Sequence, residues 1–371
     1  MDALMLPLNW QRVRLGDICE INPPTIIPNV FYYIDLENVE KGQLLNKQLM
    51  TKNKAPSRAR RLLSKNDILY QLVRPYQRNN YFFTLNGNYV ASTGYAQIRT
   101  LQNPSFLYFA LHSNYFVNAV LDRCEGTSYP AISSNELKKC EVILPPLNEQ
   151  SAIANILSGL DRYLCALDAL ILKKESVKKA LSFELLSQRK RLKGFNQAWQ
   201  RVRLGDIANY LTSNLSVEQI TQQGKIKVYD VNNFIGYTDT TFISDKPYIS
   251  IVKDGSVGRV RILPPKTNIL STMGALIANH RTTTEFLFYL LSNFDFKNFT
   301  SGSIIPHIYF KDYKEKTIFL PPLNEQNAIA NILSALDNEI ASLKNKKRQF
   351  ENIKKALNHD LMSAKIRVLE K

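Results

Sequence analysis

Cysteine and histidine, the residues that most often bind metals or form disulfides, are scarce in this sequence. The 371 residues include four of each. The cysteines lie far apart, at Cys19, Cys124, Cys140 and Cys165. No CxxC spacing occurs, so neither a zinc ribbon nor a disulfide framework is expected, and the thiols are expected to be reduced. The histidines are equally dispersed, at His112, His280, His307 and His359. They form no HExxH motif, and the sequence therefore predicts no metal site.

Long apolar runs and nucleotide-binding loops are absent as well. No stretch is long enough to cross a bilayer, and no leading apolar segment with a cleavage site precedes the rest of the chain. We therefore expect a cytoplasmic protein. Neither a P-loop nor a GxGxxG loop is present, so we expect this chain to bind no nucleotide cofactor itself.

Two short motifs resemble parts of catalytic sites but lack the remaining chemistry. Residues 22–24 match the start of the (D/N)PP(Y/F/W) signature of amino-methyltransferases, but Thr25 replaces the aromatic residue that would stack on a flipped base. Asp312 and Lys314 form a D-x-K fragment like the end of a nuclease site, and Glu315 alone does not complete a magnesium site. We expect no catalytic residues in this chain.

The charge, by contrast, is strongly one-sided. Lys and Arg number 48 against 32 Asp and Glu, which leaves a formal charge of +16. Such a surface suits a polyanion, because each neutralised phosphate releases condensed counterions. A basic protein kept soluble by its charge is the simpler alternative. The length allows two or three domains, and 44% hydrophobic residues indicate a folded protein.

The sequence contains two copies of one unit. Residues 144–161 read LPPLNEQSAIANILSGLD and residues 320–337 read LPPLNEQNAIANILSALD, so 16 of 18 positions are identical. WQRVRLGDI at 10–18 recurs unchanged at 199–207. The offset of 176 also aligns three further pairs, which are Gly126 with Gly302, Pro130 with Pro306, and Ile132 with Ile308. Repeats of this kind indicate a duplicated architecture.

Between these shared segments the two copies diverge. Residues 20–90 and 209–270 have almost nothing in common that can be aligned. A recent duplication would have kept the central parts alike as well. The pattern therefore predicts one task that both copies share and two tasks that differ.

The repeated segments predict a strand, a stop and a helix start. Each short alternating strand is followed by two prolines, which end it. Asn148 and Asn324 come next as expected N-caps, and Glu149 and Glu325 place a carboxylate in the positive first turn.

A heptad stripe then extends along each predicted helix. Its members are Ile153, Leu160, Leu167, Leu181, Ile329, Leu336, Leu343, Phe350 and Leu357. Lys174 alone interrupts it. Because this spacing is typical of helices that pack along their length, the two helices are expected to pair with each other, antiparallel. Each has about 40 residues and a length of roughly 60 Å.

These elements predict an α+β protein with a pseudo-two-fold internal repeat. Two globular α/β domains would be separated by two long antiparallel helices that form a coiled coil. The expected segments are a first domain at 1–143, a helical spacer at 144–193, a second domain at 194–319 and a second spacer at 320–371.

The doubled LPPLNEQ-x-AIANILS-x-LD helix start and the doubled WQRVRLGDI segment resemble the specificity (S) subunit of type I restriction-modification systems. The resemblance covers essentially the whole chain, and residues 55–79 look like a recurrent type of target-recognition domain in that family. It implies a non-catalytic DNA-binding subunit whose two domains each read half of a bipartite double-stranded target. It also implies two docked copies of a modification (methyltransferase) subunit that methylates adenine, together with restriction subunits where these exist. S-adenosylmethionine, ATP and magnesium are then expected on those partners.

Basic and amide side chains in the divergent segments are the candidates for DNA contact, because arginine forks suit guanine edges and phosphates and asparagine pairs with adenine. They are Arg58, Arg60, Arg61, Arg74, Tyr76, Arg78, Asn79, Lys253, Arg259, Arg261, Lys266 and Asn268. For any single one, a solvated surface charge is the simpler interpretation. The candidates for docking a shared partner are the polar residues of the repeated helix start, Asn148, Glu149, Gln150, Asn324, Glu325 and Gln326. These residues would also suffice merely to begin the helices.

Other classes of function stay open on sequence alone. A self-standing nuclease or methyltransferase would show activity in the purified chain. A coiled-coil scaffold would bind duplex DNA equally at low and high salt. A stand-alone DNA-binding protein, such as a transcription factor with two unlike half-sites, would have no need of two nearly identical helix starts.

Overall fold

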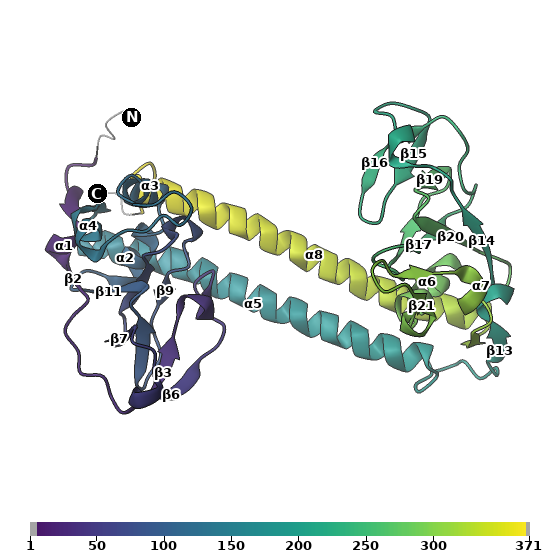
Figure 1. The fold of residues 1–371 in the computed structure, drawn as a ribbon, viewed down its shortest axis with the longest axis horizontal. Helices are drawn as coiled ribbons and strands as arrows, with labels where there is room; N and C mark the ends of the chain where they lie inside the picture. Colours follow the sequence, from purple (N-terminus) through teal and green to yellow (C-terminus); the bar gives the residue numbers. More distant parts are fainter. Residues whose placement is uncertain (1–5, 369–371) are drawn as a thin grey trace. The chain divides into compact units, whose positions relative to one another are not determined.

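The computed structural model describes residues 6–368, whose contacts form two compact units. Unit 1 comprises Met1–Asp168 with Lys346–Lys371, and unit 2 comprises Ala169–Asn345. Each unit therefore contains one globular domain and a part of both long helices (Figure 1). Over 6–368, no helix combines the length and the apolar character that a membrane span requires.

The globular part of unit 1 is built on two four-stranded sheets. The first has the order β6-β3-β10-β7, with β6 (Gln48–Thr51), β3 (Val30–Ile34), β10 (Tyr89–Ser92) and β7 (Ala59–Leu62). The second has the order β2-β11-β8-β9, with β2 (Cys19–Ile21), β11 (Tyr95–Thr100), β8 (Ile68–Gln71) and β9 (Tyr81–Phe82). Only the pairing of β10 with β3 is parallel among these strands. The turn at 93–94 leads directly from β10 into β11, so one tight turn links the two sheets.

Short helices and two further strand pairs complete unit 1. They are α1 (Leu15–Ile18), α2 (Pro104–Ala110), α3 (Asn114–Leu121), α4 (Ser134–Lys139), the pair β1 (Gln11–Arg14) with β12 (Glu141–Leu144), and the hairpin β4 (Val39–Glu40) with β5 (Gln43–Leu44). Asn103, Ser113 and Ser133 cap α2, α3 and α4 by accepting a backbone N–H, as short polar side chains do at helix starts. Leu107 and Phe116 pack with the second sheet in one buried cluster.

Unit 2 follows the same plan with different sheets. Its strands are β13 (Gln200–Arg203), β14 (Ala208–Thr212), β15 (Ile226–Tyr229), β16 (Phe234–Thr238), β17 (Tyr248–Val252), β18 (Val260–Leu263), β19 (Thr267–Ile269), β20 (Met273–Ala278), β21 (Thr300–Ser301), β22 (His307–Ile308) and β23 (Thr317–Leu320). They form the sheets β14-β20-β17-β18 and β16-β15-β19 and the pairs β13-β23 and β21-β22. Its short helices are α6 (Thr284–Ser292) and α7 (Phe310–Tyr313). β13 pairs with β23 in the register that β1 uses with β12, so the repeated sequence segments form a repeated strand pair.

The two long helices are α5 (Leu147–Leu186) and α8 (Leu323–Met362), each of 40 residues. Both begin one residue before the asparagine that the sequence suggested as N-cap. The carbonyl of Pro146 accepts the N–H of Gln150, and that of Pro322 accepts the N–H of Gln326. The N-cap prediction for Asn148 and Asn324 was therefore wrong, because the second proline of each motif already makes the first helical hydrogen bond.

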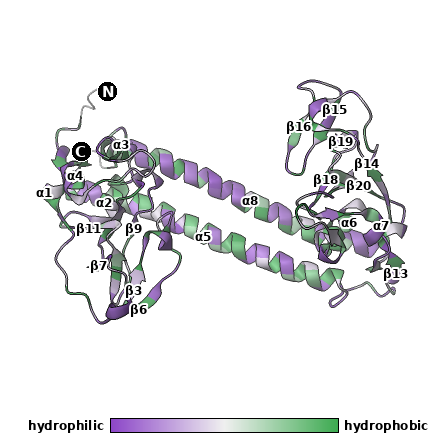
Figure 2. Cartoon of the chain, in the orientation of Figure 1, coloured by the Kyte–Doolittle hydropathy of each residue, from purple (hydrophilic) through white to green (hydrophobic). Residues whose placement is uncertain are grey.

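Within each unit the parts of α5 and α8 pair antiparallel, as the heptad stripe predicts. In unit 1 Lys347 reaches Asp168 (2.6 Å), and Lys354, seven residues later in α8, pairs with Asp161, seven residues earlier in α5. The rings of Tyr163 and Phe350 lie 4.7 Å apart between these pairs. Figure 2 shows polar and apolar residues alternating along both helices, as expected for one apolar stripe on each.

In unit 2 the residue that breaks the stripe has its own partner. Lys174 reaches Glu339 (2.8 Å), and Lys344 reaches Glu175 (2.6 Å). The interruption is therefore compensated by an ion pair between the helices. Of the predicted stripe, Ile153, Leu167 and Ile329 are buried, and the partly buried members are Leu160, Leu181, Leu336, Leu343, Phe350 and Leu357.

Candidate nucleic-acid interface and repeated junctions

A buried glutamate joins three distant segments of unit 1. Trp10 Nε1 donates a hydrogen bond to Glu149 Oε2 (3.0 Å). Arg367 donates to the same carboxylate through Nη2 (2.8 Å) and Nε (3.2 Å). Burial alone would raise the pKa of Glu149, but the hydrogen bonds from Arg367 and Trp10 outweigh it and hold the pKa below its ordinary value.

Unit 2 repeats this junction with the corresponding residues. Trp199 Nε1 donates to Glu325 Oε2 (3.0 Å), and Arg191 Nη2 donates to the same oxygen (2.6 Å). Arg191 follows α5 as Arg367 follows α8. The near-identical segments of the sequence are therefore the parts that close each domain onto the helix pair.

The glutamine next to each glutamate fixes the start of a short helix. Gln150 Oε1 accepts the N–H of Asn103, the N-cap of α2, while its Nε2 donates to the carbonyl of Pro145 (2.8 Å). In unit 2, Gln326 accepts the N–H of Thr283, the N-cap of α6. Both glutamines are buried, and all of their described partners belong to their own unit.

These contacts correct the docking prediction. Glu149, Gln150, Glu325 and Gln326 are at most 2% exposed, so they have no surface to offer a partner. Their identity in the two copies follows from packing, because a buried, charged network tolerates few substitutions. Asn148 and Asn324 are exposed. Of the six predicted docking residues, these two asparagines alone have the surface exposure that the prediction assumed.

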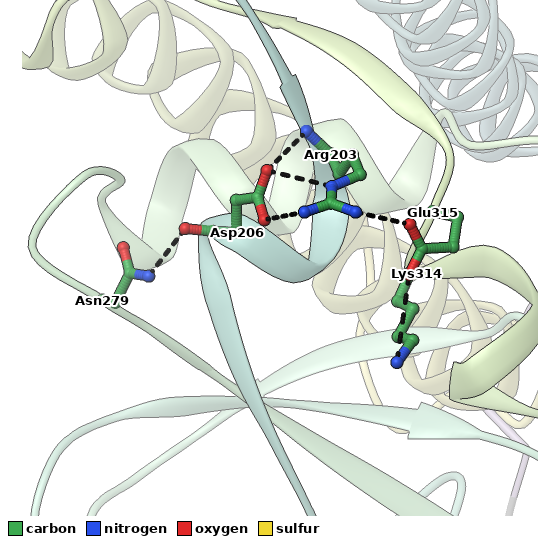
Figure 3. Close-up of polar contacts among 5 residues, drawn as sticks. All are labelled: Arg203, Asp206, Asn279, Lys314 and Glu315. Atoms are coloured by element: carbon green, nitrogen blue, oxygen red, sulfur yellow. Dashed lines mark hydrogen bonds and ion pairs between the residues drawn. The ribbon is translucent and has the colours of Figure 1, made fainter.

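Arg203 and Asp206, inside the second copy of WQRVRLGDI, belong to an ion-pair cluster of unit 2. Figure 3 shows that Arg203 lies between Asp206 and Glu315, with Nη1 donating to Glu315 Oε2 (2.9 Å). The N–H of Arg203 and then its guanidinium lower the pKa of Asp206. Asn279 donates to the carbonyl of Asp206 (2.9 Å), and Lys314 Nζ lies 3.9 Å from Glu315. The carboxylate of Glu315 thus faces an arginine and a lysine in a structural cluster.

The basic residues of unit 1 come from two segments that one turn brings together. The carbonyl of Arg58, just before β7, accepts the N–H of Thr93 (2.8 Å). The N–H of Leu72, at the end of β8, donates to the carbonyl of Gly94 (3.0 Å). The turn from β10 to β11 therefore holds the Arg58–Arg61 region close to the loop at 73–79. This turn is the physical link between the two segments that carry the predicted contact residues of unit 1.

Residues 52–78 contain a single acidic residue, Asp67, and it does not neutralise the basic surface of this segment. Asp67 is 1% exposed and accepts hydrogen bonds from Gln97 Nε2 (2.7 Å) and Arg99 Nε (2.9 Å). Its charge is thus matched by Arg99. The exposed lysines Lys52, Lys54 and Lys65 keep their excess charge at the surface.

The predicted contact residues of unit 1 differ in how free their side chains are. Arg58 pairs with Asp35 and donates to Tyr33 Oη (3.3 Å), although its own side chain is largely exposed. Arg60 is exposed, and its Nε donates to the nearby carbonyl of Ser57 (2.8 Å). Arg61 is partly buried, and burial lowers its pKa.

The remaining four candidates line the loop after β8. Arg74 lies over the ring of Tyr129 (4.1 Å), and Tyr76 is about half exposed. Arg78 donates to the His112 carbonyl (2.9 Å) and to Asn114 Oδ1 (2.7 Å), so its fork is already used inside the unit. Asn79 Oδ1 likewise accepts the N–H of Lys41 (3.1 Å).

The two arginines at 74 and 78 share an unusual backbone conformation. Both are left-handed, with φ of 54° and 55°. Such residues cost free energy outside glycine and persist where the surroundings hold them, often at functional loops. The corresponding turn of unit 2 has Gly255 and Gly258 at φ of 83° and 80°. Unit 2 thus has glycines at the left-handed positions of its turn, where unit 1 has arginines.

The candidates of unit 2 gather around a loop that the sequence did not reveal. Arg259 Nη2 donates to Asn232 Oδ1 (2.9 Å), and Arg261 Nη1 donates to the Asn232 carbonyl (2.9 Å). Arg261 also lies over the ring of Tyr229 (5.3 Å). This group joins the 259–261 segment to the turn after β15. No motif in the sequence marks Asn232.

The other three predicted DNA-contact residues of unit 2 are Lys253, Lys266 and Asn268. Lys253 is partly exposed beside the glycine turn, and Lys266 is exposed in a left-handed turn with φ of 57°. Asn268 is 3% exposed, its amide donates to the carbonyl of Thr241, and its Oδ1 accepts the N–H of Ile269 (2.8 Å). Asn268 was therefore wrong as a DNA-contact residue, because both polar atoms are used inside the fold.

Comparison with known proteins agrees with this duplicated architecture. The family model described as type I restriction modification DNA specificity domain matches residues 7–175 and again 196–352. The type I restriction enzyme MjaVIII specificity subunit of Methanocaldococcus jannaschii is 23% identical over 99% of this chain and 95% of its own length. The type I restriction-modification S subunit from M. genitalium superposes with a TM-score of 0.63 at 20% identity, over 96% of this chain and 98% of its own. A chain from a structure on complex assembly and conformational transition of the type I R-M system gives 0.59 at 21% identity, over 96% and 98%.

Proposed function

Since this chain belongs to the type I restriction-modification DNA specificity family, we propose that it selects the DNA target on which a separate modification subunit acts. Each of its two recognition domains reads one half of a bipartite duplex sequence. The chain itself contributes no catalytic group. S-adenosylmethionine is bound by the modification subunit, and ATP and magnesium serve the complete complex with its restriction subunits.

The observation that carries this proposal is a contrast within each unit. The contacts that close the domain onto the long helices are the same in both units, whereas the basic surfaces of the two domains differ. Each unit closes its domain with the same buried Trp–Glu–Arg contact. The two domains nevertheless present different basic groups, arginine-rich in the loop of unit 1 and clustered on Asn232 in unit 2. Basic surfaces with arginines and asparagines suit phosphates and base edges. Two unlike surfaces on one framework fit two unlike half-sites.

We further propose that two copies of the modification subunit bind the outer face of the repeated helix starts. The face comprises the exposed or partly exposed residues Asn148, Asn155 and Ile156 in α5 and Asn324, Asn331 and Ile332 in α8. These residues are identical in the two copies, although exposed positions generally tolerate change. An identical external face on both copies fits two copies of one partner, each bound in the same way.

The test of target selection is co-purification with a candidate modification subunit, followed by mapping of adenine methylation on genomic DNA. A discontinuous methylated sequence with two constant parts and a spacer is expected. Methyl transfer by the purified chain alone, or methylation without a bipartite sequence, would contradict the proposal.

The docking face has a separate test. Ile156→Glu is expected to reduce the stoichiometry from two modification subunits to one, and Ile156→Glu with Ile332→Glu to abolish binding, because a charge in an apolar contact is costly to desolvate. Leu172→Glu is the matched control. Leu172 is an exposed leucine of α5 whose counterpart in α8 is Arg348, so it lies outside the shared face. Equal loss in the control and the test variants, measured by native mass spectrometry, would refute this assignment.

A further inference from the structure

A small hairpin is repeated in the two units and is not part of the basic groups described above. In unit 1 Glu125 and Ala131 face each other as an antiparallel bridge. In unit 2 Ser301 and His307 do the same, at an offset of 176 residues. The connecting residues are Gly-Thr-Ser-Tyr-Pro at 126–130 and Gly-Ser-Ile-Ile-Pro at 302–306. We call these two connections the tips.

The framework of each tip is fixed by its shared residues. Gly126 and Gly302 are left-handed, with φ of 86° and 90°. A Cβ at Gly302 would collide with the carbonyl oxygen of Ile305, so this turn requires glycine. Ile132 and Ile308, which follow the hairpins, are buried in the core of their units. The identical residues thus give both tips a left-handed glycine at the start and a buried isoleucine after the proline.

Each tip is also bound to the recognition loop of its own unit. The N–H of Arg74 donates to the carbonyl of Pro130 (2.7 Å), and the N–H of Gly255 donates to the carbonyl of Pro306 (2.9 Å). In unit 2 a second contact joins Asp254 Oδ1 to His307 Nδ1 (2.6 Å). Each tip is therefore positioned next to the basic residues that we assign to DNA.

The side chains at the tips are exposed, large and different. Tyr129 is 63% exposed, Ile304 92% and Ile305 55%. Arg74 lies over the ring of Tyr129, so the tip of unit 1 combines an aromatic ring with a guanidinium. The tip of unit 2 offers two branched aliphatic groups instead. Ile304 beside Ile305, and Tyr129 beside Arg74, therefore place neighbouring large side chains on an exposed turn that a ligand can cover.

The difference between the tips identifies what covers them. A protein partner that binds both units in the same way would need like side chains at like positions, as on the outer face of α5 and α8. The tips instead have identical frameworks and unlike contact groups. The ligand must therefore also differ between the units while sharing its general form, and in the proposed function only the two DNA half-sites meet that condition.

We propose that the tips are base-reading elements, with Tyr129 contacting one half-site and Ile304 and Ile305 the other. This inference rests on the proposed function and names the residues that carry its specificity. An aliphatic side chain in a groove recognises the methyl group of thymine or wedges against a base step. Tyr129, held by Arg74, offers a hydroxyl and a flat ring to a base edge.

The experiment uses the full chain in complex with its modification subunit, after the wild-type methylated sequence has been mapped. Two variants are compared, Tyr129→Ala and the double variant Ile304→Ala with Ile305→Ala. Leu101→Ala and Val217→Ala are matched controls, since each is a strongly exposed apolar residue of the same unit outside the tips. Competition binding uses duplexes in which one base pair of one half-site is changed at a time.

The tip variants are expected to lose discrimination at one or two base pairs of a single half-site, by about 5-fold to 100-fold. The other half-site and both controls should read as wild type. Unchanged discrimination in both variants, or equal loss on every duplex including non-specific DNA, would overturn the assignment of the tips. Absence of any bipartite methylation by the wild-type complex would instead refute the proposed function, so the two failures are distinguishable.

Discussion

At the residue scale, Glu149 and Glu325 make the contacts on which both repeats depend. Each is a buried carboxylate that accepts from a tryptophan indole and from an arginine. Charge-assisted hydrogen bonds of this kind are stronger than neutral ones, and removing one partner leaves the others unpaired. This explains why the tryptophan, the glutamate and the arginine recur together in both copies.

The pH dependence of stability follows from the lowered pKa of Glu149. A carboxylate with a folded-state pKa below its ordinary value of 4.5 contributes stability above that value and loses it as the pH falls through the folded-state pKa. Glu149→Gln should therefore unfold at lower urea than wild type at about pH 7, with a difference that shrinks toward about pH 3. Glu141→Gln, a change at an exposed strand residue, is the control. A constant difference between the two pH values would contradict the assignment.

At the scale of elements, the repeated Leu-Asp at 160–161 and 336–337 contacts the repeated Lys-Lys-Ala-Leu at 354–357 and 178–181 across the helices. In unit 1 Asp161 binds Lys354, and Lys354 lies over the ring of Phe109 (5.6 Å). In unit 2 Asp337 binds Lys178, which lies over the ring of Tyr289 (5.7 Å). Each long helix thus contributes one acid and one lysine to the same kind of contact. These ion pairs are formed only in the observed register of the helices, so we expect them to favour it beside the packing of the apolar stripe.

A double-mutant cycle on Asp161 and Lys354 checks this register. Asp161→Ala and Lys354→Ala should each lower the free energy of unfolding, with a coupling of about 0.5 kcal/mol because both side chains are partly in water. Urea unfolding of the two single variants and the double variant measures it. The exposed pair Lys139 and Glu136 serves as a comparison, since it lies outside the helix pair. A coupling of zero would mean that packing alone sets the register.

At the scale of the whole molecule, one framework carries two independent surfaces. Each unit has its own sheets, its own basic groups and its own tip, and the described contacts assign these to separate compact units. A change in the surface of one unit should therefore alter recognition by that unit alone.

Changing Arg58, Arg60 and Arg74 to alanine together should abolish contact with one half-site and leave the other intact. Arg58 and Arg60 are exposed and Arg74 lies over the ring of Tyr129, whereas Arg78 is left unchanged because its guanidinium donates to the carbonyl of His112 and to Asn114. Footprinting on a duplex that contains both half-sites gives the measurement. No change at either half-site would show that this surface is misassigned, and weaker protection at both would indicate a loss of non-specific charge only.

The repeat, the helix pair and the fold class were predictable because they depend on local patterns. The period of the stripe from Ile153 to Leu357 requires two long helices that pack together, and the internal identity shows which parts the copies share. The roles of individual polar residues were less accessible. Glu149 and Gln150 follow a helix start where exposed polar residues are usual, and only their contacts with Trp10 and Asn103 show that they are buried.

The sequence by itself determined the duplication, the pairing of the helices and the basic character of both domains, because periodicity, identity and charge are properties of the chain. Tertiary structure alone decided which arginines are free and which are engaged, since Arg78 and Asn268 meet their partners only after distant segments come together. It also decided which identical residues close the fold and which face outward. Burial depends on what packs over a residue, and that neighbour is set by the folded chain and not by the residue's place in a motif.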